Sequence, residues 1–187
     1  AGYEGRRVIG YDLSADNISN IRTALVDHIG LTPDQFTLHH SCGIEMDEYR
    51  QASNQVDLFL NDIPYIMGAE KYTDDPRDLC NVKDLDQFYN RVEVMLRNMK
   101  RLVKPSDFEK KIYKPIIMKV GSQRRGKQGL YRMDSEIEMI GRRVGLVLHD
   151  VITNELKPTL QYLQQCIANK IAVKCHETSL VFLKYEV

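Results

Sequence analysis

The chain lacks tryptophan, an excess of charge of either sign, and any paired Cys-x-x-Cys motif. Acidic and basic residues number 26 each, so no overall field draws the molecule to a nucleic acid or a membrane. No apolar run approaches the roughly 20 residues that span a bilayer. The Gly-x-x-x-x-Gly-Lys-Ser/Thr order of a phosphate-binding loop is also missing. Any preference for nucleic acid must therefore come from a local patch.

Cysteine usage indicates a reducing environment. The four cysteines are far apart in a chain of 187 residues, which is not the pattern of a small disulfide-rich protein. With 43% hydrophobic residues the chain can bury a core without metal or disulfide support. We expect an intracellular, cytoplasmic protein with free and mostly buried thiols at Cys42, Cys80, Cys166 and Cys175.

The first 62 residues predict a strand, a helix and two further strands. Val8–Leu13 is apolar and bounded by turn residues, and apolar residues at helical spacing follow a cap at Asp16. Gly30 supplies the left-handed stop of that helix, and Phe36–His40 is extended. Val56–Leu60 is the next predicted strand, ended by Asn61 and Asp62.

This stretch resembles the ubiquitin-like, or β-grasp, domains over residues 7–62. The start of that family's helix is matched by Asp16-Asn-Ile-Ser-Asn-Ile21, and the turn after the helix by Gly30-Leu-Thr-Pro-Asp-Gln35. The family's first strand would precede Val8, so it is missing or replaced by a segment such as Leu180–Tyr185. The resemblance implies an α+β fold with a ubiquitin-like N-terminal unit that binds other proteins. No Gly-Gly tail follows Leu60, so conjugation is not implied.

The rest of the chain predicts helices followed by a second small α+β unit. A helix from Leu85 to Val103 begins at a capping-box-like Asp84 and is stopped by Pro105. Residues 137–152 fit either a helix or a strand. The expected organisation is a unit over 1–62, a linker over 63–82 and a segment over 83–187. Further predicted elements are a strand at Tyr113–Val120, a helix over 156–171, and strands at Ala172–Cys175 and Leu180–Tyr185. The last two strands are separated by the predicted turn residues His176–Ser179.

The strongest local charge signal is the glycine-rich stretch from Lys119 to Arg132, which contains no acidic residue. Guanidinium groups on a flexible backbone suit phosphate contacts, and a tyrosine can stack on a base. An exposed loop that docks on an acidic surface, such as residues 74–86, is the alternative interpretation. The candidate nucleic-acid or phosphate contacts are Lys119, Arg124, Arg125, Lys127, Tyr131 and Arg132.

No residue set predicts a metal site, a cofactor site or a catalytic centre. The densest group of metal-ligating types includes His39 and His40, but neighbouring strand residues face opposite sides. Cys175 and His176 are adjacent, which is not the hydrogen-bond geometry that a thiolate and base need. The carboxylates of residues 74–86 lack the ligand spacing of a calcium loop.

These observations favour a non-enzymatic protein-interaction or scaffold module within a larger assembly, including self-association. The missing first strand supports this hypothesis, because an incomplete sheet edge accepts a strand from a partner. The alternative is an RNA- or nucleic-acid-binding protein, a viral or ribonucleoprotein component, that uses residues 119–132. An enzyme with a site assembled from separated residues is the third interpretation. A membrane partner is not expected.

Overall fold

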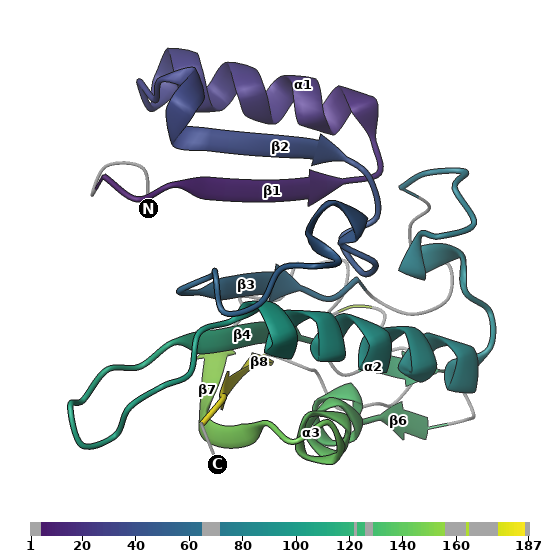
Figure 1. Cartoon of the computed structure of the whole chain (residues 1–187). Helices are drawn as coiled ribbons and strands as arrows, with labels where there is room; N and C mark the ends of the chain where they lie inside the picture. The colour runs from purple at the N-terminus through teal and green to yellow at the C-terminus, as the bar shows by residue number, and fades with distance from the viewer. Residues whose placement is uncertain are drawn as a thin grey trace. The chain divides into compact units, whose positions relative to one another are not determined.

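The computed structural model describes residues 5–64, 72–121, 123–125, 129–155, 164 and 176–185 (Figure 1). They form two compact units, the first within Ala1–Gln51 and Ile66–Asn98, the second within Ala52–Tyr65 and Met99–Val187. These bounds differ from the expected segments 1–62, 63–82 and 83–187. Within the described ranges, no helix has both the length and the apolar composition to cross a membrane.

The first unit is built on a strand–helix–strand motif. β1 (Val8–Asp12) and β2 (Phe36–His40) pair in parallel, with Val8 opposite Phe36. Parallel neighbours need a crossover connection, which α1 (Ala15–Thr23) and the π-helical turn Ala24–His28 supply. All three elements were predicted from the sequence at nearly these bounds.

Two details of α1 refine the prediction. The N-cap is Ser14, whose hydroxyl accepts a hydrogen bond from the backbone N–H of Asn17 at 3.2 Å. Asp16, the predicted cap, lies instead in the first turn, where its charge suits the positive end of the helix. Gly30 has the expected left-handed φ of 74°.

The helix α2 (Leu85–Leu102) confirms the prediction for that segment. The side chain of Asp84 accepts from the N–H of Gln87 at 2.8 Å, as a capping residue does. Phe88, Val92 and Leu96, spaced by four residues, are completely buried and give the helix its apolar face. Short 3-10 turns complete the first unit at Pro33–Gln35, Asp47–Tyr49 and Leu79–Asn81.

The second unit contains a four-stranded mixed sheet with the order β3-β4-β8-β7. β3 runs parallel to β4, whereas β8 is antiparallel to both β4 and β7. Pro115 stands at the first residue of β4, where its missing N–H is tolerated although β4 is an interior strand. The strands are β3 (Phe59–Asp62), β4 (Pro115–Val120), β7 (Val147–Glu155) and β8 (His176–Leu183).

Residues 137–152 contain both of the predicted alternatives. α3 (Met133–Arg143) ends at Val144, and β7 starts three residues later. Gly145 makes this transition with a φ of 81°. The ammonium of Lys100 in α2 donates to the carbonyl of Val144 at 2.8 Å, so a cation sits at the negative end of α3.

Several predictions for the later part of the chain change. Residues His176–Ser179 were predicted as a turn but belong to β8, because all four pair with β7 and the last two of them pair with β4 as well. The predicted basic loop contains a small hairpin of β5 (Gln123–Arg125) and β6 (Gly129–Tyr131). The helix predicted over 156–171 and the strand over 172–175 lie outside the described residues, apart from residue 164.

The ubiquitin-like β-grasp expectation is wrong. β1 and β2 form a two-stranded parallel sheet of their own, and the predicted last strand contributes to a different sheet as β3. The segment near Leu180 does not replace a missing first strand beside β1, because β8 is bound between β4 and β7. The predicted strand, helix and strand are present, but the two strands pair in parallel as in an α/β crossover unit.

The contact of α3 with the sheet depends on Gly141. A Cβ atom placed on this residue would overlap the fully buried ring of Phe182 in β8, with Cζ only 2.7 Å away. Met133, Ile137 and Ile140 share the buried face of α3. The helix can therefore approach β8 closely only because this position has no side chain.

Substituting Gly141→Ala should destabilise the second unit. Overpacking costs about 1–3 kcal/mol, against a gain of about 1 kcal/mol from the better helix former. We expect a net loss of about 0–2 kcal/mol in the free energy of unfolding, measured by urea denaturation. Met139→Ala, on the exposed side of α3, is the control and should change stability by under about 0.5 kcal/mol. A Gly141→Ala protein more stable than the wild type would contradict this packing.

Candidate functional site

A row of polar side chains crosses one face of the sheet in the second unit. Asp62 and Lys119 are paired residues of β3 and β4, so their side chains project to the same side. The ammonium of Lys119 lies 2.9 Å from Oδ2 of Asp62 and 2.9 Å from Oε2 of Glu177 in β8. Each of three neighbouring strands thus contributes one charged group, and the lysine joins the two carboxylates.

The burial of these three groups differs sharply. The Glu177 side chain is 10% exposed and that of Lys119 38%, whereas the Asp62 side chain is 66% exposed. Hydrogen bonds from Lys119 to Asp62, and then to Glu177, raise the pKa of the lysine above its ordinary value. Lys119 therefore stays charged in neutral solution. Glu177 has the counter-ion that a buried carboxylate needs, and Asp62 reaches solvent.

The polar row continues to the other edge of the sheet. The side-chain amide of Asn154 in β7 donates to the hydroxyl of Ser179 in β8 at 2.9 Å. Ser179 is the register partner of Lys119, so this pair lies on the same face. The opposite face carries the buried residues Ile116, Met118 and Val120, so alternation along β4 separates the polar from the apolar side.

Asp62 stands where ligands bind in α/β proteins. It is the last residue of β3, at the carboxyl end of a parallel strand, and such ends are the usual ligand-binding edge of an open sheet. Sequence reasoning treated Asn61 and Asp62 only as the end of a strand. The available signal was a pair of polar residues directly after an apolar strand and just before Pro64.

The first unit has a comparable carboxylate. Asp12 is the last residue of β1, also a parallel strand. Its Oδ1 accepts from the N–H of Ser14 at 2.7 Å, and its Oδ2 accepts from the amide of Asn17 at 3.2 Å. These bonds orient the carboxylate and leave each oxygen a further lone pair for a hydroxyl donor.

The histidines at the end of β2 are held by the protein itself. His39 stacks on Tyr11, with ring centroids 4.9 Å apart, and its Nδ1 lies 3.8 Å from Glu48. A ring nitrogen of His40 lies 3.0 Å from the carbonyl of Leu13. In the part of the chain that the structure describes, no three His, Cys, Asp or Glu side chains are grouped to hold a metal ion. Two of the cysteines predicted to be buried are confirmed as buried, Cys42 and Cys80.

The structure gives positions to most of the residues predicted to contact nucleic acid. Lys119 belongs to the polar row, and Arg132 forms an ion pair with Asp134 at 3.0 Å. Arg124 and Arg125 lie in β5 and Tyr131 in β6, with side chains outside the described part. Lys127 lies outside the described residues. A role for these residues in nucleic-acid contact stays a prediction.

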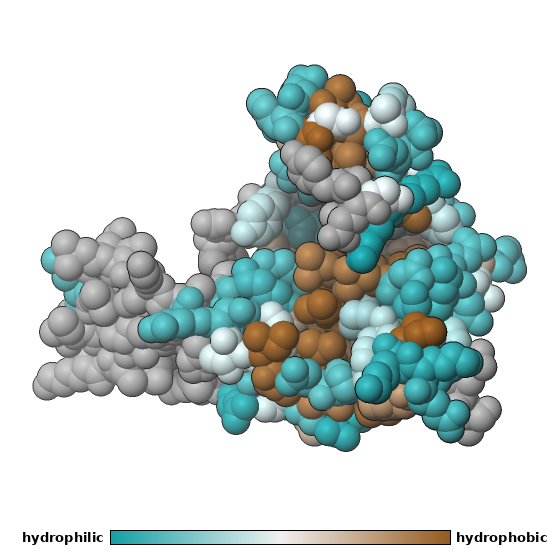
Figure 2. Space-filling model, turned by 90° about the vertical axis from the view of Figure 1, so that its left-hand side faces the viewer, coloured by the Kyte–Doolittle hydropathy of each residue, from teal (hydrophilic) through white to brown (hydrophobic). Residues whose placement is uncertain are grey.

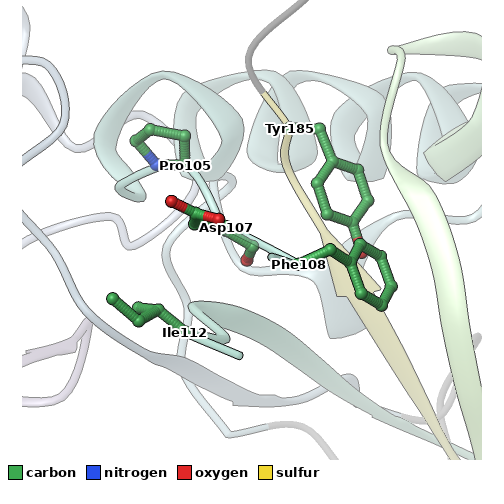
Figure 3. Close-up of a pocket in the computed structure, with 6 residues that line it drawn as sticks. Pro105, Asp107, Phe108, Ile112 and Tyr185 are labelled. Atoms are coloured by element: carbon green, nitrogen blue, oxygen red, sulfur yellow. The ribbon is translucent and has the colours of Figure 1, made fainter. Parts of the chain in front are cut away.

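A separate cavity of about 480 Å³ lies at the opposite, amino-terminal end of β4. Figure 3 shows the rings of Phe108 and Tyr185 lying against each other at its wall, and their centroids are 5.1 Å apart. Burial raises the pKa of the Tyr185 phenol. Ile112, also in the lining, is 43% exposed. Figure 2 shows apolar side chains interrupted by hydrophilic ones on the face that it presents.

The charges beside this cavity are satisfied within the chain. Asp57 accepts from Lys114 at 2.6 Å and from Lys104 at 3.0 Å, and these bonds, Lys114 first, lower the pKa of its carboxyl. Lys110 is bound by Asp107 at 2.8 Å. The cavity therefore has an aromatic wall but little unbalanced charge, which distinguishes it from the polar row.

The ion pairs of Asp57 predict a pH-dependent contribution to stability. Because the folded pKa lies below the unfolded value, the contribution is present above that unfolded value and is lost as pH falls through the folded pKa. Asp57→Asn should lower the free energy of unfolding by about 0.2–1 kcal/mol at pH 7, the range for exposed pairs. In urea titrations the gap should be smaller at an acidic pH, where the carboxyl of Asp57 is protonated, than at pH 7. An equal gap at both pH values would refute this account.

Comparison with known proteins identifies the fold. No protein-family model matches the chain, and no curated protein matches it. A SAM-dependent methyltransferase of Methanosarcina mazei is 11% identical, covers 100% of this chain and 85% of its own, and has a TM-score of 0.56. A Thermus thermophilus protein, provisionally described as a DNA modification methylase and complexed with S-adenosyl-L-methionine, is 15% identical over 97% of this chain and 56% of its own, with a TM-score of 0.51.

A third match is the PvuII DNA methyltransferase, described as cytosine-N4-specific, at 16% identity over 72% of this chain and 44% of its own, with a TM-score of 0.51. The chain has the fold of the SAM-dependent methyltransferases. It spans about half the length of the Thermus and PvuII proteins. At these identities the likeness establishes the fold alone.

These matches correct the main expectations from the sequence. The fold is a Rossmann-like α/β arrangement with a mixed sheet, not an α+β β-grasp. The expectation of a non-enzymatic scaffold module is contradicted, because the three solved proteins named above, which share the fold, are described as methyltransferases or a methylase. The hypothesis of a viral or ribonucleoprotein component fails for the same reason. The expected protein partners and self-association find no support in these matches.

Proposed function

We propose that the chain is the core of a methyltransferase that moves a methyl group from S-adenosylmethionine to an exocyclic amino group of a base in DNA. The observation that carries the proposal is Asp62, a solvent-reaching carboxylate at the carboxyl end of β3 in a sheet of methyltransferase fold. Matched proteins described as DNA methyltransferases support the choice of substrate. The predicted intracellular, cytoplasmic location stays a prediction.

Asp12 has the chemistry needed to hold the cofactor. In Rossmann-like folds an acidic residue after a strand accepts hydrogen bonds from the ribose hydroxyls of a nucleotide cofactor. Asp12 fits this use, since its carboxylate is fixed by Ser14 and Asn17 and keeps lone pairs for hydroxyl donors. S-Adenosylmethionine, when bound, supplies a methyl group on a positively charged sulfur, ready for transfer to a nucleophile.

Asp62 would act on the methyl acceptor. A carboxylate that accepts an N–H of an amino group raises the electron density on nitrogen and receives the proton that nitrogen loses as its bond to carbon forms. Oδ2 already accepts from Lys119, whereas Oδ1 has no partner among the described residues. The sheet therefore presents one oriented carboxylate oxygen to an incoming amino group.

The base would leave the DNA stack to reach this carboxylate. Enzymes that modify a base extrude it into a pocket, hydrogen-bond its Watson–Crick edge and stack it on aromatic side chains. After Asp62 the sequence continues with Ile63, Pro64 and Tyr65, which offers such a ring, although Tyr65 lies outside the described residues. The cationic residues 124–132 are proposed as contacts to the phosphate backbone.

The direct test is transfer of radiolabelled methyl from S-adenosylmethionine to DNA. We expect incorporation into duplex or single-stranded DNA, and digestion of the product to nucleosides should yield an N-methylated base. The same transfer is measured on RNA of the same sequence. Labelling of RNA alone would replace DNA as the substrate, and labelling of neither at high enzyme concentration would refute the proposed function.

Replacing the acceptor-side carboxylate should remove turnover without unfolding the protein. Asp62→Asn should lower kcat by roughly 100-fold or more, within the range for loss of a general acid–base group. Its effect on stability should stay under about 1 kcal/mol, because the side chain is largely exposed. Asp57→Asn, an exposed carboxylate away from the polar row, should keep full activity. Wild-type kcat in the Asp62→Asn enzyme would exclude this role.

Replacing the cofactor-side carboxylate should weaken cofactor binding. Asp12→Asn loses a charged acceptor worth about 1.5–3 kcal/mol, so the Kd for S-adenosylmethionine should rise roughly 10- to 100-fold in calorimetric titrations. Asp16→Asn, four residues further along the chain and exposed, is the matched control and should bind normally. Equal affinities in the two variants would place the ribose elsewhere.

A further inference from the structure

The geometry points to Lys119 as a positioning residue that fixes the rotamer of Asp62 and is itself fixed by Glu177. This inference rests on the proposed function, because it assigns to Lys119 the orientation of the carboxylate that receives the amino group. It differs from the role that the sequence gives Lys119, which is a phosphate contact within the basic stretch.

Glu177 anchors the lysine. As a whole residue it is 8% exposed, and in β8 it pairs with Asn154 of β7, so its carboxylate is largely withdrawn from solvent. Its Oε2 lies 2.9 Å from the ammonium of Lys119. A buried carboxylate without a cation is costly, so the lysine head is held at this place on β4. The flexible side chain thereby becomes a fixed donor.

The anchored lysine in turn holds Asp62. This aspartate is the last residue of an edge strand, and its side chain is 66% exposed. An exposed aspartate in such a place would exchange freely between rotamers. The 2.9 Å bond from Lys119 to Oδ2 selects one of them and leaves Oδ1 without a partner among the described residues. A reacting group must be held close to its productive geometry, which gives this bond a use beyond stability.

Positioning and phosphate binding make different demands on Lys119. Two of its three ammonium donors are directed to Asp62 and Glu177, and the raised pKa of the lysine reflects those two acceptors. The neighbouring carboxylates cancel its charge locally, so it attracts an anion weakly. Removal of Lys119 should therefore affect the turnover step more than the affinity for DNA.

The experiment compares Lys119→Met, Lys119→Arg and Glu177→Gln with the wild type. Lys119→Met should lower kcat roughly 10-fold or more while the KM for DNA changes less than about threefold, the pattern expected when only transition-state interactions are lost. Lys119→Arg, which keeps the charge and its donors, should recover most of the lost kcat. The kcat of Glu177→Gln should lie between those of Lys119→Met and the wild type. Circular dichroism and thermal unfolding confirm that each variant is folded.

A second measurement does not depend on activity. Three-bond NMR couplings to Cγ of Asp62 report its χ1 rotamer, which should be single in the wild type and in Lys119→Arg, and averaged in Lys119→Met. An unchanged single rotamer in folded Lys119→Met overturns the inference, whatever the activity. So does a raised KM with unchanged kcat, which would make Lys119 a phosphate contact. A wild type that transfers no methyl group refutes the proposed function. If the χ1 rotamer of Asp62 is nevertheless averaged in Lys119→Met, Lys119 is still established as the group that orders this carboxylate.

Discussion

Parallel pairing of β3 with β4 is the constraint on which the second unit depends. It puts Asp62 beside Lys119, and antiparallel pairing of β4 with β8 then brings Glu177 to the same face. The three charges are separated by up to 115 residues in sequence, from Asp62 to Glu177. No local feature of the chain could assemble them. Backbone hydrogen bonding creates this side-chain arrangement, and the ion pairs then stabilise it.

Because side chains alternate between the two faces of the sheet, one face packs in the core and the other carries polar groups. Ile116, Met118 and Val120 are buried on one face of β4, while Lys119 stands between the last two and projects to the other. Packing and chemistry therefore use neighbouring residues without conflict. The close approach at Gly141 and Phe182 secures the apolar side, which leaves the opposite side available for polar groups.

The sequence was informative about elements and uninformative about their partners. Periodicity placed β1, α1, β2 and α2 within a few residues, because each depends on local spacing and caps. It could not tell that β1 and β2 pair with each other in parallel, and the strand–helix–strand order is common to both folds that were in question. The β8 error has the same origin, since polar residues such as Glu177 and Thr178 indicate a turn until both neighbouring strands are known.

The candidate site was only partly visible in the sequence for a related reason. In the sequence Lys119 is one cation of a basic stretch, and Asp62 marks the end of a predicted strand. Neither interpretation included the other residue, because electrostatic partners are set by register. Cations at positions 124–132 were conspicuous because they are clustered. A single carboxylate at a strand end gives no such signal, yet the topology makes it the more informative residue.

The contact of Lys100 with the carbonyl of Val144 has a consequence for how the second unit melts. Gly145 combines a left-handed φ with a position where any Cβ would lie 2.6 Å from that ammonium. The carbonyl at the end of α3 is thus hydrogen-bonded by a lysine from a different helix. Fraying of that turn exposes a carbonyl and releases a cation together, so amide exchange near Val144 should report on α2 as well as on α3.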